Sequence, residues 1–351
     1  MFFCLEKKVL HFKQPAGTSR GVYTTRKIWL VHLSEGEKTG VGECAPLPDL
    51  SCDALPDEIY EAKLHQFCQT LCQTGELDDE ALRPYPSMRF GLETAVLSLQ
   101  SSLHSPLSTL LLFDTPFSRG EEGIPINGLV WMGNYDEMLQ RMEEKLEKGF
   151  RCVKLKIGAI DFDQELDLVK RIRDRFSFHE VELRLDANGA FKYEEALYKL
   201  ELLSQYAIHS IEQPIRQGQW AYMAELCRES PLPIALDEEL IGVNDPEMKG
   251  HMLNVIKPRY IILKPSLHGG MKGCREWIET ARQQGIGSWI TSALESNIGL
   301  NAIAQFASDV YGPHIRMPQG LGTGQLFTDN IPMPLTIQGD QLFSRQKNIR
   351  T

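Results

Sequence analysis

The sequence predicts an α/β protein whose larger part is a (β/α)8-type barrel, a modified TIM barrel, with an N-terminal α+β capping domain. Two observations predict this fold. From Ile124 onward, eight short β-type runs alternate with polar loops and amphipathic helical segments. The runs recur about every 25 to 30 residues, enough for one strand and one returning helix, and right-handed crossovers then close a parallel sheet into a barrel. The chain before residue 120 instead has short strands followed by helices.

The composition excludes several classes of protein. The chain has 351 residues, 42% hydrophobic and 24% charged, which excludes disordered, collagen-like and coiled-coil proteins. With 37 basic and 47 acidic residues its net charge is −10, so we expect neither nucleic acid nor a membrane as a partner. Sparse cysteines and the lack of a long apolar run predict a cytoplasmic location. The oligomeric state stays open.

The first 120 residues are expected to form the capping or lid domain. An opening strand leads into a polar loop over Lys13–Thr25, and a second strand follows over Lys27–Leu33. Apolar residues spaced three and four apart predict helices over Asp57–Cys72 and Ser87–Leu103. Phe117–Gly123, rich in glycine and charge, is expected to link this domain to the barrel.

The barrel is expected to occupy residues 121–326. Its eight predicted strands are Ile124–Val130, Cys152–Ile157, Val181–Asp186, Ile208–Glu212, Pro233–Asp237, Tyr260–Lys264, Gly287–Ser292 and His314–Pro318. The tail, residues 327–351, lacks the repeating pattern, and we expect it to pack back on the capping domain and complete it.

Charged residues are predicted inside the barrel, at the ends of its strands. Side chains alternate along a strand, and the apolar face of Cys152–Ile157 must meet the outer helices. Lys154 and Lys156 therefore point inward. The same test places one inward charged residue at the end of each of the next four strands: Asp186, Glu212, Asp237 and Lys264.

This polar layer predicts metal-assisted proton transfer. Buried charges are costly unless they are paired or bind a metal, and catalytic groups of this fold lie at the carboxyl ends of its strands. The carboxylates of Asp186, Glu212 and Asp237 favour Mg²⁺, with Mn²⁺ as a substitute. Lys156 and Lys264 flank them, and a lysine facing a dication has its pKa lowered toward that of a general base. We expect abstraction of a proton next to a substrate carboxylate, with the metal stabilising the enediolate.

The same residues carry a family resemblance. The motifs Lys154-x-Lys156, Asp186-Ala-Asn188, Glu212-Gln-Pro214, Asp237-Glu238 and Lys264-Pro265 resemble those of the enolase superfamily. Two opposed lysines resemble its muconate lactonising enzyme subgroup. Three further segments resemble the o-succinylbenzoate synthases of menaquinone biosynthesis: Gly42–Pro48, Thr291–Gly299 and Pro318–Thr323. The resemblance covers nearly the whole chain.

This resemblance implies a lyase acting on a small-molecule carboxylate. The reaction would be the syn-dehydration of 2-succinyl-6-hydroxy-2,4-cyclohexadiene-1-carboxylate to 2-succinylbenzoate. Lys156 would remove the proton α to the ring carboxylate, and Lys264 would face the enediolate as a stabilising cation. Lys154 lies deeper in the barrel and would act as an electrostatic helper.

Six residues are candidate substrate contacts. The Lys13–Thr25 loop is expected to act as a lid, with Arg20 meeting the succinyl carboxylate. Arg184 either contacts the substrate or neutralises Glu182, and both readings stay open. Asn188 is a further candidate. The ends of the last two predicted strands supply the rest, Ser292, Glu295 and Gly320.

Two other functions remain open on the sequence. A dipeptide epimerase or N-acylamino acid racemase of the same superfamily would use both lysines to exchange protons. Epimerases of this subgroup tend to carry Asp-x-Asp at the end of strand eight, and Met317–Gly322 has none, which favours the synthase. A non-catalytic ligand-binding barrel is the third reading, and the complete set of lysines and carboxylates argues against it.

Overall fold

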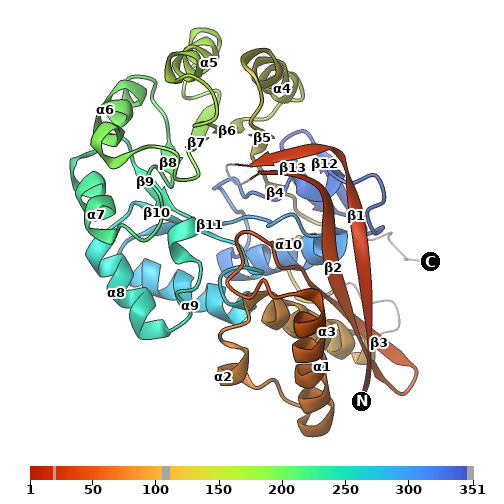
Figure 1. Cartoon of the computed structure of the whole chain (residues 1–351). Helices are drawn as coiled ribbons and strands as arrows, with labels where there is room; N and C mark the ends of the chain where they lie inside the picture. The colour runs from red at the N-terminus through yellow and green to blue at the C-terminus, as the bar shows by residue number, and fades with distance from the viewer. Residues whose placement is uncertain (19–20, 105–110, 346–351) are drawn as a thin grey trace.

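The main body of the computed structural model is a curled parallel sheet with helices around its outside (Figure 1). The structure describes residues 1–18, 21–104 and 111–345. Within these residues, seven parallel strands follow one another across the sheet in chain order. They are β5 (Gly128–Val130), β6 (Cys152–Lys156), β7 (Glu182–Asp186), β8 (Ser210–Glu212), β9 (Ile234–Leu236), β10 (Tyr260–Leu263) and β11 (Gly287–Ile290). The predicted α/β barrel class is confirmed.

The eighth predicted strand, His314–Pro318, is wrong. Residues of this run form bends and unpaired backbone, and Pro318 has no N–H to donate to a strand ladder. The chain instead approaches closure at the next two residues, Gln319 and Gly320. These make isolated parallel bridges to Ile126 and Thr291, just beyond the two edge strands of the sheet.

Helices connect the strands and cover the outer face of the sheet (Figure 1). They are α4 (Tyr135–Glu147), α5 (Phe162–Arg175), α6 (Tyr193–Ser204), α7 (Trp220–Glu229), α8 (Pro246–Ile256), α9 (Gly270–Gln283) and α10 (Asn297–Tyr311). Val153 and Leu155 of β6 share one buried apolar cluster with Leu168 and Ile172 of α5. The lysines that alternate with these apolar residues therefore face the interior. Two short 3-10 helices also occur: η1 (Glu238–Leu240) follows the end of β9, and η2 (Thr323–Gln325) follows the isolated bridge at Gly320.

The N-terminal module packs a three-stranded antiparallel sheet against helices. Its elements are β1 (Phe2–Thr18), β2 (Gly21–Glu35), β3 (Lys38–Cys44), α1 (Asp57–Thr74), α2 (Asp79–Leu82) and α3 (Pro86–His104). The two predicted helices are confirmed to within two residues at each end. β3 packs closely against α3. The two backbones are so near that a Cβ at Gly42 would lie 1.8 Å from the carbonyl oxygen of Gly91, so only glycine fits there.

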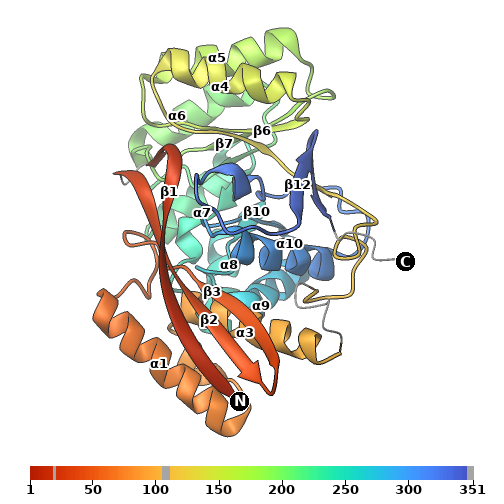
Figure 2. The ribbon, with the colours of Figure 1, turned by 90° about the vertical axis from the view of Figure 1, so that its right-hand side faces the viewer.

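The described residues of the expected loop, 13–18 and 21–25, are instead the ends of two long paired strands, β1 and β2. β1 continues to Thr18, and Ala16 pairs with Tyr23 across the hairpin after an irregularity in register. Backbone pairing across the two strands thus orders a segment whose glycine and polar content predicted a loop. Figure 2 shows this hairpin running from the N-terminal module up alongside the barrel.

The C-terminal tail contacts both parts of the chain. Phe327 bridges to Phe12 of β1, and Asp329 accepts a hydrogen bond of 2.8 Å from the backbone N–H of His11. Beyond them, β12 (Leu335–Gln338) and β13 (Gln341–Ser344) form a hairpin on β4 (Ile124–Pro125), at the entry to the barrel. The tail therefore meets the capping sheet first and the barrel afterwards.

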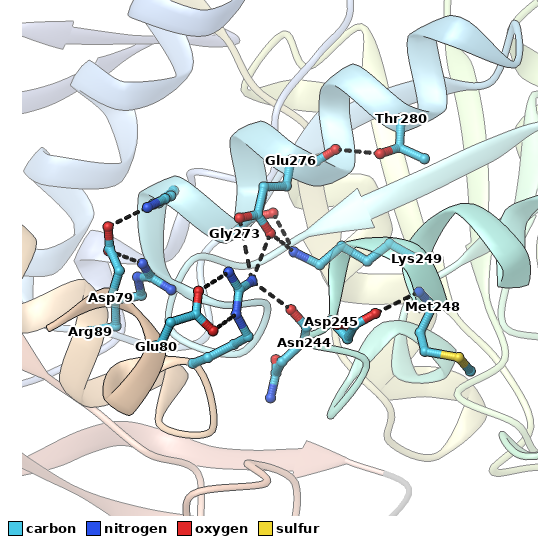
Figure 3. A network of polar contacts seen from close by, with 12 residues as sticks. Asp79, Glu80, Arg89, Asn244, Asp245, Met248, Lys249, Gly273, Glu276 and Thr280 are labelled. Carbon is cyan, nitrogen blue, oxygen red and sulfur yellow. Dashed lines mark hydrogen bonds and ion pairs between the residues drawn. The ribbon is translucent and has the colours of Figure 1, made fainter.

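A polar network joins the N-terminal module to α8 and α9 (Figure 3). Arg89 of α3 is buried and pairs with Asp79 of α2, while Lys249 of α8 lies 2.5 Å from Glu276 of α9. Arg83, after α2, connects the two sides, since it donates to the carbonyl oxygen of Asn244 at 3.0 Å. The network holds the module against one side of the barrel.

Within the described ranges, the helices are each too short or too polar to be candidate bilayer spans.

Candidate active site

A cavity of about 530 Å³ lies at the carboxyl ends of the barrel strands, a volume suited to a small organic ligand. Lys156 of β6, Asp186 of β7 and Lys264, directly after β10, line it from the barrel. Tyr23 and Leu47 line it from the N-terminal module. The ligand space is therefore shared by the two parts of the chain.

The lysines and carboxylates predicted from the strand pattern form one cluster: Lys154, Lys156, Asp186 and Lys264 line the cavity, while Glu212 and Asp237 contact these lysines from outside its lining. Lys154 Nζ lies 2.9 Å from Asp186 Oδ2 and 2.5 Å from Glu212 Oε2. Lys156 Nζ lies 3.1 Å from the same Asp186 oxygen, and Lys264 pairs with Asp237. Since these residues come from β6, β7, β8 and the ends of β9 and β10, the fold brings five strand ends together.

The charges of this cluster shift one another's pKa values. Burial opposes the charged forms of Lys154 and Lys264, but the carboxylates facing them raise the pKa of each lysine above its ordinary value. These directions describe the cluster without a cation, where carboxylates are the nearest charges to both lysines. Burial, followed by the negative charge of Asp186, raises the pKa of Glu212.

The carboxylates fit a divalent cation in chemistry, although lysines now separate them. Over residues 1–18, 21–104 and 111–345, no three acidic, His or Cys side chains converge closely enough to hold a metal as they stand. Each of the three carboxylates contacts an ammonium instead. Yet Oε1 of Glu212 and Oδ1 of Asp237 are buried with no hydrogen-bond partner in the described structure. Hard oxygen atoms left in this way are suitable Mg²⁺ ligands.

Asn188 and Trp131 surround the ammonium group of Lys156. Asn188 Oδ1 accepts a hydrogen bond of 2.8 Å from Lys156 Nζ, and Asn188 Nδ2 donates to Glu238 Oε1 at 3.0 Å. Asn188 has φ of 44°, a backbone conformation that only a few residue types adopt readily. The ring centroid of Trp131 lies 5.6 Å from Lys156 Nζ. The sequence analysis missed Trp131, although its position directly after the first barrel strand was a usable signal.

Two of the candidate contacts from the last strand ends line the cavity and one does not. Ser292 and Gly320 are at its surface. Glu295 is fully buried, and its two oxygens accept hydrogen bonds of 2.6 Å from Ser266 and 2.7 Å from Ser292. The prediction that Glu295 lines the ring pocket is wrong because this carboxylate supports the loop from beneath.

Arg184 lies inside the barrel, below the cavity. It donates to Glu182 Oε1 at 2.7 Å and to the carbonyl oxygen of Pro318 at 2.9 Å. Its guanidinium carbon lies 4.4 Å from the ring centroid of Trp289. Of the two readings of Arg184, the structure therefore favours the structural one. Arg20, the candidate for the succinyl carboxylate, lies outside the described residues.

His268, which follows the strand of Lys264, also contacts the site. Its side chain is buried, and Nδ1 accepts a hydrogen bond of 2.9 Å from the backbone N–H of Lys264. The imidazole thereby fixes the end of β10, from which the Lys264 side chain reaches the cavity. Its position four residues after Lys264 was the sequence signal for this contact.

Comparisons with known proteins identify the family. Two family models match the chain, "Enolase C-terminal domain-like" over residues 137–334 and "MenC, N-terminal domain" over residues 18–99. The chain is 47% identical to the o-succinylbenzoate synthase of Desulfotalea psychrophila, covering 95% of this chain and 96% of that protein. The crystal structure of MenC from Desulfotalea psychrophila superimposes with a TM-score of 0.79 and 41% identity, over 97% and 99% of the two chains.

A more distant structure shares the fold. The dipeptide epimerase of Enterococcus faecalis, solved in complex with Mg and the dipeptide L-Leu-L-Tyr, matches with a TM-score of 0.79 at 18% identity, over 97% and 96% of the chains. At this identity the likeness concerns the fold alone. The family models and the close relative together assign the sequence, and the chain belongs to the o-succinylbenzoate synthase family of the enolase superfamily.

Proposed function

We propose that this chain is a Mg²⁺-dependent hydro-lyase of menaquinone biosynthesis. It converts 2-succinyl-6-hydroxy-2,4-cyclohexadiene-1-carboxylate into 2-succinylbenzoate and water. One observation carries the proposal: the ammonium groups of Lys156 and Lys264 line a single cavity together with Asp186, in a chain 47% identical to a named o-succinylbenzoate synthase.

Lys156 acts as the general base. It removes the proton α to the ring carboxylate, and the electrons of the C–H bond pass to the carboxylate as an enediolate. Their return forms the new ring double bond as the C–O bond breaks. Because the elimination is syn, the proton and the hydroxyl leave from one face, so the ammonium of Lys156 is placed to return its proton to the departing hydroxyl as water. Asn188, hydrogen-bonded to Nζ, orients Lys156 for both transfers.

Lys264 and Lys154 act through their charge. The positive charge of Lys264 stabilises the negative charge that develops on the substrate, and Lys154, paired with Asp186 and Glu212, remains an ammonium behind them. Aromatisation supplies much of the driving force, so positioning of the ring is the main task of the site.

Asp186, Glu212 and Asp237 would hold the cation. When bound, Mg²⁺ would stabilise negative charge on the substrate carboxylate, and Mn²⁺ would substitute for it. The buried oxygens Glu212 Oε1 and Asp237 Oδ1, which have no hydrogen-bond partner among the described residues, support this assignment.

The division of the chain follows from this proposal. Residues 1–120 act as the capping domain that closes the cavity, residues 121–326 as the catalytic barrel, and residues 327–351 as the tail. We also propose a cytoplasmic enzyme without a nucleic-acid or membrane partner, which the net charge of −10 supports.

The test compares two substrates on the purified protein with Mg²⁺. We expect loss of the diene absorbance of the cyclohexadiene substrate, and its arrest by EDTA with recovery on adding Mg²⁺ or Mn²⁺. In D₂O, an L-Ala-Glu type dipeptide should show no α-proton exchange. Exchange in the dipeptide without dehydration of the diene would assign an epimerase instead. If neither reaction occurred, the chain would be a ligand-binding barrel.

A further inference from the structure

Arg26 is a buried arginine of β2 that connects the N-terminal module to the loop after β11. Its side chain is 3% exposed. Among the described residues, its guanidinium donates hydrogen bonds to five main-chain carbonyl oxygens, those of Lys27, Ala45, Pro46, Ala293 and Leu294. The Nε bond to Leu294 measures 3.1 Å.

Four of these five carbonyls, all except that of Lys27, belong to two segments that line the cavity and share one apolar cluster. Ala45 and Pro46 directly precede Leu47, which lines the cavity from the N-terminal module. Ala293 and Leu294 line it from the barrel. We call Leu47, Ala293 and Leu294 the apolar wall. One guanidinium thus bonds to both halves of the apolar wall.

The barrel half of the apolar wall needs such support. Leu294 has φ of 65°, a left-handed conformation that is unfavourable for a branched apolar residue and persists only where surrounding contacts fix it. Burial lowers the pKa of Arg26, and the negative charges of two buried carboxylates, Glu295 and Glu43, offset part of this cost. Glu43 accepts a hydrogen bond of 2.8 Å from the N–H of Ser296, so it anchors the far end of the same loop.

We propose that Arg26 is a positioning residue that fixes the apolar wall and thereby sets the affinity of the site for its substrate. The inference rests on the proposed function for the identity of that substrate. A planar guanidinium with five N–H donors can serve carbonyls on two segments at once. An ammonium offers three donors from a single point, so lysine at this position replaces arginine only in part.

The test is a split between KM and kcat in Arg26→Gln and Arg26→Lys, with Arg83→Gln as the matched control. Arg83 also bridges the N-terminal module and the barrel, through Glu80 and Asn244, but has no contact with the described residues of the apolar wall. We expect Arg26→Gln to raise KM at least fivefold and to change kcat less than threefold. The reason is that the apolar wall contacts the substrate equally in the ground state and in the transition state. Arg26→Lys should raise KM by less than Arg26→Gln does. Arg83→Gln should leave KM unchanged, even if it lowers Tm as much as Arg26→Gln.

A wild-type KM in folded Arg26→Lys, or equal KM values for the two glutamine variants, would overturn the proposal. If Arg26→Gln does not fold, the comparison of KM between Arg26→Lys and Arg83→Gln decides whether the proposal holds. Hydrogen exchange separates this inference from the proposed function: amides of residues 291–296 should exchange faster in the Arg26 variants than in the Arg83 variant, whichever substrate the enzyme uses. Unchanged exchange there would exclude a positioning role even if dehydration is observed.

Discussion

The amide of Asn188 lies between Lys156 and Glu238, accepting from the ammonium at 2.8 Å and donating to the carboxylate at 3.0 Å. The amide therefore fixes where the ammonium hydrogen atoms point. The backbone N–H of Asn188 also donates to Asp186 Oδ1 at 3.1 Å, so this one residue contacts both the lysine and a carboxylate of the site. Catalysis by Lys156 should depend on this arrangement as well as on the lysine itself.

Replacing Lys156 with alanine should nearly abolish turnover. A positioned general base contributes a factor of about 10² to 10⁴, and Lys156 serves both proton transfers in the proposed reaction. The initial rate of diene loss measures the effect, with circular dichroism and Mg²⁺ titration calorimetry showing that the variant folds and binds metal. Lys170→Ala is the control, since Lys170 is exposed and pairs with Asp174 on α5. A Lys156→Ala variant that kept most of its rate would refute the base assignment.

Replacing Asn188 with glycine should lower kcat about 10- to 100-fold while KM changes less, because the lysine loses its orienting partner. Glycine adopts the φ of 44° found here without strain, so the loss reports the side chain and not the backbone. Asn134→Gly is the matched control, since Asn134 caps α4 and such a change costs only a few tenths of a kcal/mol. If both glycine variants kept wild-type kcat, Asn188 would have no orienting role.

The charged cluster could be predicted from the sequence because it follows from strand periodicity. Alternation along a strand fixes which side chains face inward, and Lys156 and Asp186 then fall on neighbouring strand ends, paired in register in the structure. No contact between distant segments had to be known. The same argument could not assign Glu295, whose position depends on a bond to Ser266 in the turn after another strand.

The hairpin at Lys13–Thr25 and the incomplete eighth strand were mispredicted for a related reason. Glycine and polar residues predict a loop, but pairing of Ala16 with Tyr23 is a property of two strands together. The run before Gln319 has the apolar content of a strand, yet Pro318 removes a donor and only isolated bridges form after it. The local sequence pattern therefore indicated which segments form helices and strands and which side chains face inward. Which strands pair with each other depended on contacts between distant segments.

Gly320→Ala should damage the cavity, whereas Gly322→Ala should be tolerated. A Cβ at Gly320 would lie 1.9 Å from the side-chain oxygen of Thr291 and 2.4 Å from its Cβ, closer than atoms can approach. A Cβ at Gly322 would come no nearer than 3.5 Å to its surroundings. We expect a loss of about 1 to 3 kcal/mol in the free energy of unfolding for Gly320→Ala, with a raised KM. Urea unfolding and diene kinetics on both variants check this, and equal behaviour would contradict it.

Stability should fall with rising pH because of Asp53. Burial raises the pKa of this carboxyl from its ordinary value to about 6, although Ser87 donates to it from its backbone N–H at 2.8 Å and from its hydroxyl at 2.6 Å. Between about pH 4 and pH 6 the native state thus holds a proton that the unfolded chain has released. The carboxyl therefore favours folding below its unfolded pKa, and about 1 to 3 kcal/mol of that stability is lost as pH rises through 6.

Asp53→Asn should remove this dependence, because the amide does not titrate and its oxygen can still accept from Ser87. Urea unfolding at pH 4, 5, 6 and 7 should show the variant gaining stability relative to the wild type as pH rises. Asp57→Asn is the control of opposite sign, since hydrogen bonds from Lys27 and Lys7 lower the pKa of the Asp57 carboxyl. That variant should lose stability relative to the wild type as pH rises through the acid range, by a small amount because the pair is exposed. A difference between Asp53→Asn and wild type that stayed constant over this range would show that the Asp53 carboxyl has the same pKa in the native and unfolded states, which would contradict the prediction.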